Sequence, residues 1–123
     1  MSKKILIVDD EPDILKIVIF RLKTKGYQTI SARSGENALQ LLAGNRPDLI
    51  ILDLRLPGIN GDEVCRKIKA DEKLKDIPVI LLTASTGQDI EKLSQGIGAV
   101  DFIRKPFDSQ NFINKVENIF REK

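Results

Sequence analysis

The chain has 123 residues and a nearly balanced charge, with 20 Lys and Arg against 18 Asp and Glu and a formal net charge of +2. This length suits one domain with a substantial core, and the dispersed basic residues exclude the positive stripe typical of nucleic-acid binding. The single cysteine excludes an internal disulfide, and the absence of histidine removes the usual general base and any imidazole metal ligand.

Apolar runs and helix signals alternate along the sequence. Pro12 opens the first helical segment and Gly26 stops it, while Ser34 and Asp108 are expected to cap two later helices. In chain order the sequence predicts a strand over 4–8, a helix over 12–25, a strand over 28–32, a helix over 35–43, a strand over 48–53, a helix over 62–70, a strand over 78–83, a helix over 88–96, a strand over 100–103 and a helix over 109–120. Five β-α units in strict alternation predict an α/β fold, a three-layer α-β-α sandwich around a parallel sheet, in a single domain over 1–123.

Acidic residues end two of the most apolar strands. Asp9 and Asp10 follow the run 5–8, and Asp53 closes the run 49–52. In an open α/β sheet the ligand crevice lies outside the carboxyl ends of the strands, so three carboxylates are expected in one small pocket. Such a cluster is unfavourable unless a hard cation sits among them, and carboxylate oxygens suit Mg²⁺. The sequence therefore predicts a magnesium-assisted acidic site.

Two further residues fall at the same predicted edge. Thr83 ends the fourth strand, and Lys105 follows the fifth strand, directly before Pro106. A hydroxyl and a positive charge beside Asp53 are the groups needed to hold oxygens of a phosphoryl group attached to a carboxylate. Phosphoryl transfer depends mainly on positioning and charge neutralisation, so these residues indicate phosphoryl chemistry at Asp53.

With these residues in place, the chain resembles the receiver domain of bacterial two-component response regulators, including the chemotaxis regulators. The resemblance spans nearly the whole chain in the family's order. It rests on the segments Ile7-Val8-Asp9-Asp10-Glu11-Pro12, Pro47-Asp48-Leu49-Ile50-Ile51-Leu52-Asp53, Leu56-Pro57-Gly58-Ile59-Asn60-Gly61, Val79-Ile80-Leu81-Leu82-Thr83-Ala84 and Gly98-Ala99-Val100-Asp101-Phe102-Ile103-Arg104-Lys105-Pro106-Phe107. It implies a flavodoxin-like fold with the strand order 2-1-3-4-5.

The resemblance also implies roles for individual residues. Asp53 would accept a phosphoryl group from a phosphohistidine on a partner kinase. Asp10 would bind Mg²⁺ directly, Asp9 mainly through water, and the backbone carbonyl of Arg55 would complete the protein ligands.

After transfer, Thr83 and Lys105 would bind the phosphoryl oxygens, and Phe102 would act as the switch aromatic that turns inward with Thr83. The Lys105-Pro106 peptide bond is expected to be cis. Arg55 and Ser85 flank the path of the attacking water, and Arg55 either shields the phosphoryl group or points to solvent.

The implied partners are a histidine kinase or histidine phosphotransfer protein and a downstream target protein. The target would bind the face of the fourth helix, fifth strand and fifth helix, and the protein would be a monomer or a weak dimer when phosphorylated. The chain is either a stand-alone regulator or the receiver of a larger DNA-binding regulator or hybrid kinase. A degenerate receiver that binds partners without phosphorylation is a further alternative.

Other function classes fit the sequence poorly. A P-loop nucleotide hydrolase needs a glycine-rich loop with Gly-Lys-Ser/Thr after the first strand, and a flavin carrier needs a hydroxyl-rich phosphate loop there, but residues 9–12 are acidic. A haloacid-dehalogenase-type phosphatase expects a second Asp two residues after its nucleophile, where this chain has Arg55. We therefore expect a switch that catalyses only its own phosphorylation and dephosphorylation, not an enzyme acting on other substrates.

Two helices carry additional hypotheses. On the first helix Ile14, Leu15, Val18 and Leu22 share one face, and Phe20 falls nearly opposite it. Ile19 or Phe20 is expected to help dock a helical histidine-bearing partner.

The fourth helix has only Ile90 and Leu93 as apolar anchors and carries Ser94 and Gly96, which favour helices weakly. We expect it to lie at the low-stability end of the structure, as a segment that phosphorylation shifts.

The sequence shows no membrane or export signal. No apolar run approaches the ~20 residues needed to span a bilayer, and no signal peptide precedes Ile5. These features predict a cytoplasmic protein without membrane association or direct DNA binding.

Overall fold

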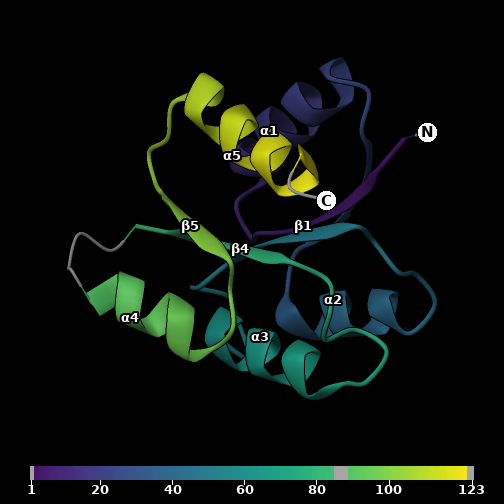
Figure 1. The fold of residues 1–123 in the computed structure, drawn as a ribbon, viewed down its shortest axis with the longest axis vertical. Helices are drawn as coiled ribbons and strands as arrows, with labels where there is room; N and C mark the ends of the chain where they lie inside the picture. The colour runs from purple at the N-terminus through teal and green to yellow at the C-terminus, as the bar shows by residue number, and fades with distance from the viewer. Residues whose placement is uncertain (1, 85–88, 122–123) are drawn as a thin grey trace.

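The computed structural model describes residues 2–84 and 89–121 (Figure 1). Within these residues, strands and helices alternate as the sequence predicts. They are β1 (Lys4–Val8), α1 (Pro12–Thr24), β2 (Gln28–Ala32), α2 (Gly35–Leu42), β3 (Leu49–Asp53), α3 (Gly61–Ala70), β4 (Val79–Thr83), α4 (Asp89–Gly96), β5 (Asp101–Arg104) and α5 (Ser109–Arg121).

The strands form one parallel sheet in the order β2-β1-β3-β4-β5. Helices α1 and α5 cover one face of the sheet, and α2, α3 and α4 cover the other (Figure 1). The predicted α/β class, the three-layer sandwich and the flavodoxin-like strand order are all confirmed.

The central strands are apolar because both of their faces are covered. All residues of β3 and β4 are buried, as expected for parallel strands between helical layers. Alternate side chains of β1 enter different cores: Leu6 and Val8 pack with the α2 and α3 side, whereas Ile5 and Ile7 pack with α1 and α5. The sheet thus forms one wall of both cores.

The predicted helix signals act as expected. The Ser34 hydroxyl accepts a hydrogen bond from Asn37 N (3.1 Å), and the Asp108 carboxylate accepts one from Asn111 N (3.0 Å). Gly26 follows α1 with φ +91°, the left-handed geometry that ends a helix.

Several predicted boundaries are wrong by one residue. Strand β4 starts at Val79 and not at Pro78, and β5 spans Asp101–Arg104 and not 100–103. Pro78 has no N–H to donate to a neighbouring strand. In the sequence, however, Pro78 directly precedes the apolar run of β4, so the hydrophobic pattern does not show that the strand starts one residue later. The predicted start of the fourth helix at Gln88 and the predicted role of Ser85 fall outside the described residues.

Helix α1 buries one stripe and exposes the other. Leu15, Val18 and Leu22 are buried, whereas Phe20 is 65% exposed and Ile17 is 48% exposed. The predicted core stripe of α1 is therefore confirmed for these three residues. Among the described residues, none of the helices has the length and apolar character required for a membrane span.

Candidate acidic site

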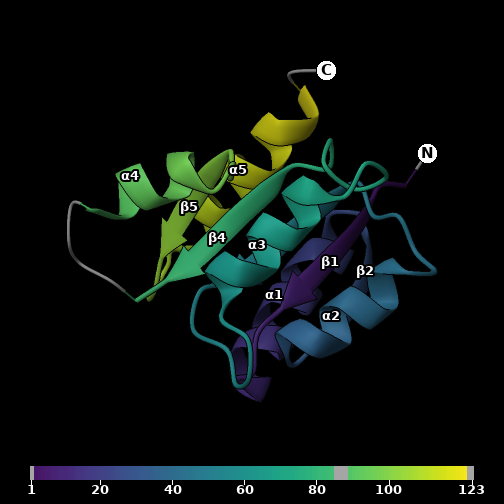
Figure 2. The same cartoon turned by 90° about the horizontal axis from the view of Figure 1, so that it is seen from below.

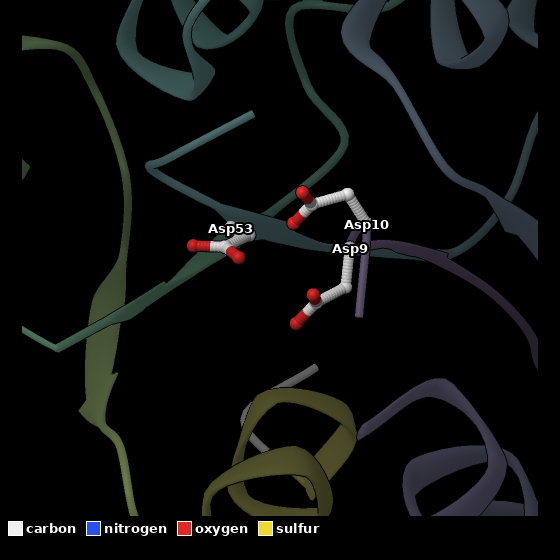
Figure 3. Close-up of side chains that lie close together, drawn as sticks. All are labelled: Asp9, Asp10 and Asp53. Carbon is white, nitrogen blue, oxygen red and sulfur yellow. The ribbon is translucent and has the colours of Figure 1, made fainter. Parts of the chain in front are cut away.

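The carboxyl ends of the strands bring the predicted acidic residues together. In Figure 2 the arrowheads of β1, β4 and β5 point toward the same edge of the molecule. Asp9 and Asp10 leave β1, and Asp53 is the last residue of β3. One carboxylate oxygen of each of the three residues lies within 4.8 Å of the others (Figure 3). The chain thus brings Asp53 beside two adjacent carboxylates that lie 44 and 43 residues earlier in the sequence.

Asp9 is fully buried at this edge. Its Oδ1 accepts a hydrogen bond from Glu11 N (2.9 Å). Its Oδ2 lies 2.9 Å from Lys105 Nζ but has no partner in hydrogen-bond geometry among the described residues. A buried carboxylate oxygen with an unsatisfied lone pair is unfavourable, and a hard cation would satisfy it. The carboxylate set therefore fits a divalent metal ion such as Mg²⁺.

Asp53 is 4% exposed and is held on both oxygens. Its Oδ1 accepts a hydrogen bond from Arg55 N (3.1 Å), and its Oδ2 accepts one from Lys105 Nζ (2.9 Å). Burial raises the pKa of the Asp53 carboxyl, the nearby Asp9 charge adds to that rise, and the bonds from Lys105 and Arg55 oppose it. The carboxylate is thus placed where a positive charge would stabilise it.

Lys105 supplies positive charge to this cluster. Its Nζ lies 2.9 Å from a carboxylate oxygen of each of Asp9, Glu11 and Asp53, and its side chain is 12% exposed. Burial lowers the pKa of Lys105, but the three carboxylates outweigh burial and hold that pKa above its ordinary value. The peptide bond from Lys105 to Pro106 is cis, as expected.

Thr83 is the last residue of β4 and is 4% exposed. It pairs in register with Arg104, and its carbonyl accepts a hydrogen bond from Lys105 N (2.7 Å). The backbone therefore joins the ends of β4 and β5 directly. Thr83 and Lys105 meet at the edge that carries Asp53, as the strand assignments predict.

The β3–α3 loop, residues 54–60, is fixed at both ends. A Cβ on Gly61 would collide with the backbone carbonyl of Asp53, so only glycine allows α3 to start this close to the strand. Gly58 has φ +73°, and Ile59 N donates a hydrogen bond to Glu36 Oε2 (3.2 Å). This role of Glu36, which lies on α2, was not predicted from the sequence.

A surface groove of about 550 Å³ adjoins the carboxylates. Its lining mixes apolar and charged side chains, namely Asp10, Leu54, Arg55, Leu56, Pro57, Asn60, Asp62 and Leu93. Arg55 is exposed, so its side chain is available to molecules entering the groove. The groove opens beside the acidic cluster and gives it access to solvent.

Phe102 lies on the edge strand β5, half-buried against the core on the α2–α4 side. The Arg104 guanidinium lies 5.3 Å and the Lys115 ammonium 5.6 Å from its ring centroid, a cation–π arrangement. Lys115 Nζ also donates hydrogen bonds to Asp101 Oδ1 (3.0 Å) and to the Phe102 carbonyl (3.1 Å). Phe102 therefore lies beside both α4 and α5.

The fold and the strand-end carboxylates define a class: flavodoxin-like α/β proteins with an acidic edge at the carboxyl ends of the strands. The response regulator receiver domain family matches residues 5–117, and the chain belongs to that family. The resemblance inferred from the motifs is thus confirmed, and the acidic loop after β1 separates the chain from P-loop and flavin-binding proteins.

Relatives with this domain occur in different contexts. The chain is 37% identical over 121 residues to the phosphate regulon transcriptional regulatory protein PhoB of Pseudomonas aeruginosa, covering 98% of this chain but 53% of that protein. The chain thus spans about half the length of this curated relative.

Two solved structures extend the comparison. The chemotaxis response regulator CheY4 of Vibrio cholerae superposes with a TM-score of 0.92 and 27% identity over 97% of this chain and 99% of that one. The receiver domain of a Pseudomonas aeruginosa sensor histidine kinase, with magnesium coordinated in its active-site cleft, has a TM-score of 0.87 and 28% identity over 96% and 97% of the two chains.

Proposed function

We propose that Asp53 accepts a phosphoryl group from a phosphohistidine of a partner kinase or phosphotransfer protein, and that the phosphorylated chain controls a downstream protein. The observation that carries this proposal is the meeting of three carboxylates within 4.8 Å with an ammonium 2.9 Å from Asp53. These groups supply a nucleophile, a cation site and a positive charge for the phosphoryl oxygens.

The chemistry needs no external base. A carboxylate oxygen of Asp53 attacks the phosphorus, a P–O bond forms, and the P–N bond to the donor imidazole breaks with its electron pair returning to nitrogen. Hydrolysis reverses the modification: water attacks the phosphorus, the Asp53 carboxylate leaves, and inorganic phosphate is released. The chain acts only on its own phosphoryl group, which distinguishes it from a phosphatase.

Mg²⁺ is the proposed cofactor. Asp10 and Asp53 would hold it directly, Asp9 mainly through water, and the Arg55 carbonyl would complete the protein ligands. When bound, the ion neutralises charge that develops on the transferring group. The Oδ2 of buried Asp9 supports this assignment, because it has the Lys105 ion pair but no hydrogen-bond partner among the described residues.

Thr83 and Lys105 are the proposed ligands of the phosphoryl oxygens after transfer. The hydrogen bond from Lys105 N to the Thr83 carbonyl links their movements. We propose that this change reaches Phe102 on β5 and alters the face formed by α4, β5 and α5, to which the target binds. The protein would act as a monomer or weak dimer in the cytoplasm, over one domain spanning 1–123.

The test is intact mass after incubation with acetyl phosphate, with and without Mg²⁺. The wild type should gain one phosphoryl group, ~80 Da, only with Mg²⁺, and Asp53→Ala should gain none. Asp48→Ala is the matched control, because Asp48 lies just before β3, at the opposite end of the strand from Asp53. An adduct on Asp53→Ala would reject Asp53 as the phosphorylation site, and an Mg²⁺-independent adduct would reject Mg²⁺ as the cofactor. No adduct with intact donor would support the alternative of a phosphorylation-independent binding module.

The exposed stripe of α1 is the proposed docking surface for the histidine-bearing partner. Phe20 is 65% exposed, and a large exposed aromatic side chain is a common interface anchor. Phe20→Ala should slow phosphoryl transfer from a cognate phosphodonor protein without changing the rate with acetyl phosphate. Lys67→Ala, exposed on α3 across the sheet from α1, is the control. Unchanged transfer from every cognate donor would exclude Phe20 from docking.

A further inference from the structure

One ion-pair partner of Lys105, Glu11, is not among the strand-end aspartates of β1 and β3. Glu11 Oε1 lies 2.9 Å from Lys105 Nζ, in hydrogen-bond geometry. Glu11 stands between β1 and α1, and its backbone N–H is fixed on Asp9 Oδ1. The side chain, however, is 57% exposed. The backbone of Glu11 is therefore fixed by a hydrogen bond, whereas its carboxylate is free to change rotamer toward solvent.

The ammonium is shared among three carboxylates in this state. Asp9 and Asp53 are held in the buried edge of the sheet, so their contacts with Lys105 depend on the fold itself. The Glu11 contact depends only on a side-chain conformation. Because exposed ion pairs contribute little net free energy, Lys105 can exchange Glu11 for a better partner at small cost.

We propose that Glu11 is a positioning residue that holds Lys105 in the unphosphorylated protein and competes with the phosphoryl group for its ammonium. This inference rests on the proposed phosphorylation of Asp53. A phosphoryl group carries close to two negative charges, so phosphorylation replaces the single charge of the Asp53 carboxylate with about two. The Asp53 Oδ2 already lies 2.9 Å from the same Nζ. Glu11 opposes the phosphorylated state both by occupying Lys105 and by placing a like charge beside the phosphoryl oxygens.

The experiment measures the affinity of the Mg²⁺-loaded protein for beryllofluoride, an acyl-phosphate mimic, by calorimetry and by NMR shifts. Glu11→Gln keeps the side-chain size but removes the charge. It should bind beryllofluoride roughly three- to ten-fold more tightly than wild type. The gain should shrink as salt rises, since the Debye length falls from ~10 Å at 0.1 M to ~3 Å at 1 M.

Asp13→Asn is the matched control. Asp13 is an exposed carboxylate in the first turn of α1, two residues beyond Glu11. The Asp13→Asn substitution removes the same charge near the site without removing a partner of Lys105. Among the described residues, the ion pairs of Lys105 are with Asp9, Glu11 and Asp53. This variant should bind beryllofluoride within about two-fold of wild type.

The outcomes separate the two proposals. Unchanged or weaker beryllofluoride binding by folded Glu11→Gln, or an equal gain in Asp13→Asn, would overturn the role of Glu11 while leaving Asp53 phosphorylation intact. Wild type that fails to bind beryllofluoride, or Asp53→Asn that binds it equally well, would instead overturn the proposed function. Melting temperatures of the variants verify that each is folded.

Discussion

Asp53 sets burial against charge at the residue scale. Burial raises the pKa of its carboxyl above the ordinary 3.8, so the folded state binds a proton more tightly than the unfolded state. Above the pKa of the carboxyl in the folded state, its negative charge lowers the free energy of unfolding. This destabilisation disappears as the pH falls toward the pKa of the carboxyl in the unfolded state. Asp53→Asn should raise the melting temperature of the metal-free protein at pH 7, by roughly 2–8 °C, with a smaller gain near pH 4.

Magnesium should reverse the order of melting temperatures of wild type and Asp53→Asn. A cation that binds only the folded state stabilises it, so Mg²⁺ should raise the melting temperature of wild type more than that of Asp53→Asn. Asp48→Asn is a suitable control, because Asp48 Oδ2 accepts a hydrogen bond from Lys4 N (2.8 Å) at the opposite end of β3. It should be neutral or destabilising. A lower melting temperature for metal-free Asp53→Asn at pH 7 would contradict the argument.

The meeting of Asp9, Asp10 and Asp53 could be predicted because parallel strands align their carboxyl ends. A residue's position at a strand end is enough to place it. The contact of Glu11 with Lys105 could not be predicted, since it joins an exposed side chain to a residue 94 positions away. Its only sequence signal is its place directly after the two aspartates. Local patterns do not encode the direction of such a side chain.

At the scale of elements, the β3–α3 loop depends on Gly58. Its φ of +73° costs an L-residue roughly 1–2 kcal/mol, and a Cβ there would also collide with the Glu36 carboxylate. To make room, Glu36 would have to give up its hydrogen bond from Ile59 N. Gly58→Ala should therefore lower the free energy of unfolding by roughly 2–3 kcal/mol in chemical denaturation, more than the backbone cost alone.

Gly26 provides the matched control for this prediction. It has φ +91°, but a Cβ there would meet no atom within 4 Å, so Gly26→Ala should cost only the backbone strain. Adding Glu36→Ala to Gly58→Ala should bring the cost of the alanine at position 58 close to that of Gly26→Ala. If the two single glycine variants were equally destabilised, Glu36 would not restrict the loop.

Helix α4 is the element expected to respond to phosphorylation. It buries only Ile90 and Ser94, whereas α3 buries Gly61, Val64, Cys65 and Ile68. Few buried apolar contacts place α4 at the low-stability end of the fold. Beryllofluoride with Mg²⁺ should change amide hydrogen exchange in α4 several-fold and leave α3 nearly unchanged. Equal exchange in α4 with and without beryllofluoride would indicate ordinary fraying.

The elements themselves were predictable from period and caps. Strands β3 and β4 are continuous apolar runs, and the Ser34 and Asp108 caps start α2 and α5. The ends were less predictable, because a strand ends where its neighbour stops pairing. The last residue of β5, Arg104, is a strand residue because Thr83 lies opposite it. No property of Arg104 alone indicates that pairing.

On the scale of the whole molecule, the sheet joins two cores. One core packs on the α2–α4 side and includes Val64, and the other packs on the α1 and α5 side and includes Val116. Both valines are fully buried. Since every central strand contributes side chains to both cores, neither core can lose its packing without exposing the sheet that supports the other. This coupling supports our prediction that the chain unfolds as one cooperative domain.

The coupling of the two cores can be tested with a matched pair of truncations, Val64→Ala and Val116→Ala. Each should lower the free energy of unfolding by roughly 1–3 kcal/mol. Tyr27 packs on the α1 and α5 side. In both variants the unfolding transition followed by Tyr27 fluorescence should coincide with the transition followed by far-ultraviolet circular dichroism of the whole chain. A Val64→Ala protein whose circular dichroism changed before the Tyr27 signal would show that the layers unfold separately. Coincident transitions would show that the strands that carry the carboxylates, β1 and β3, are stabilised by both cores.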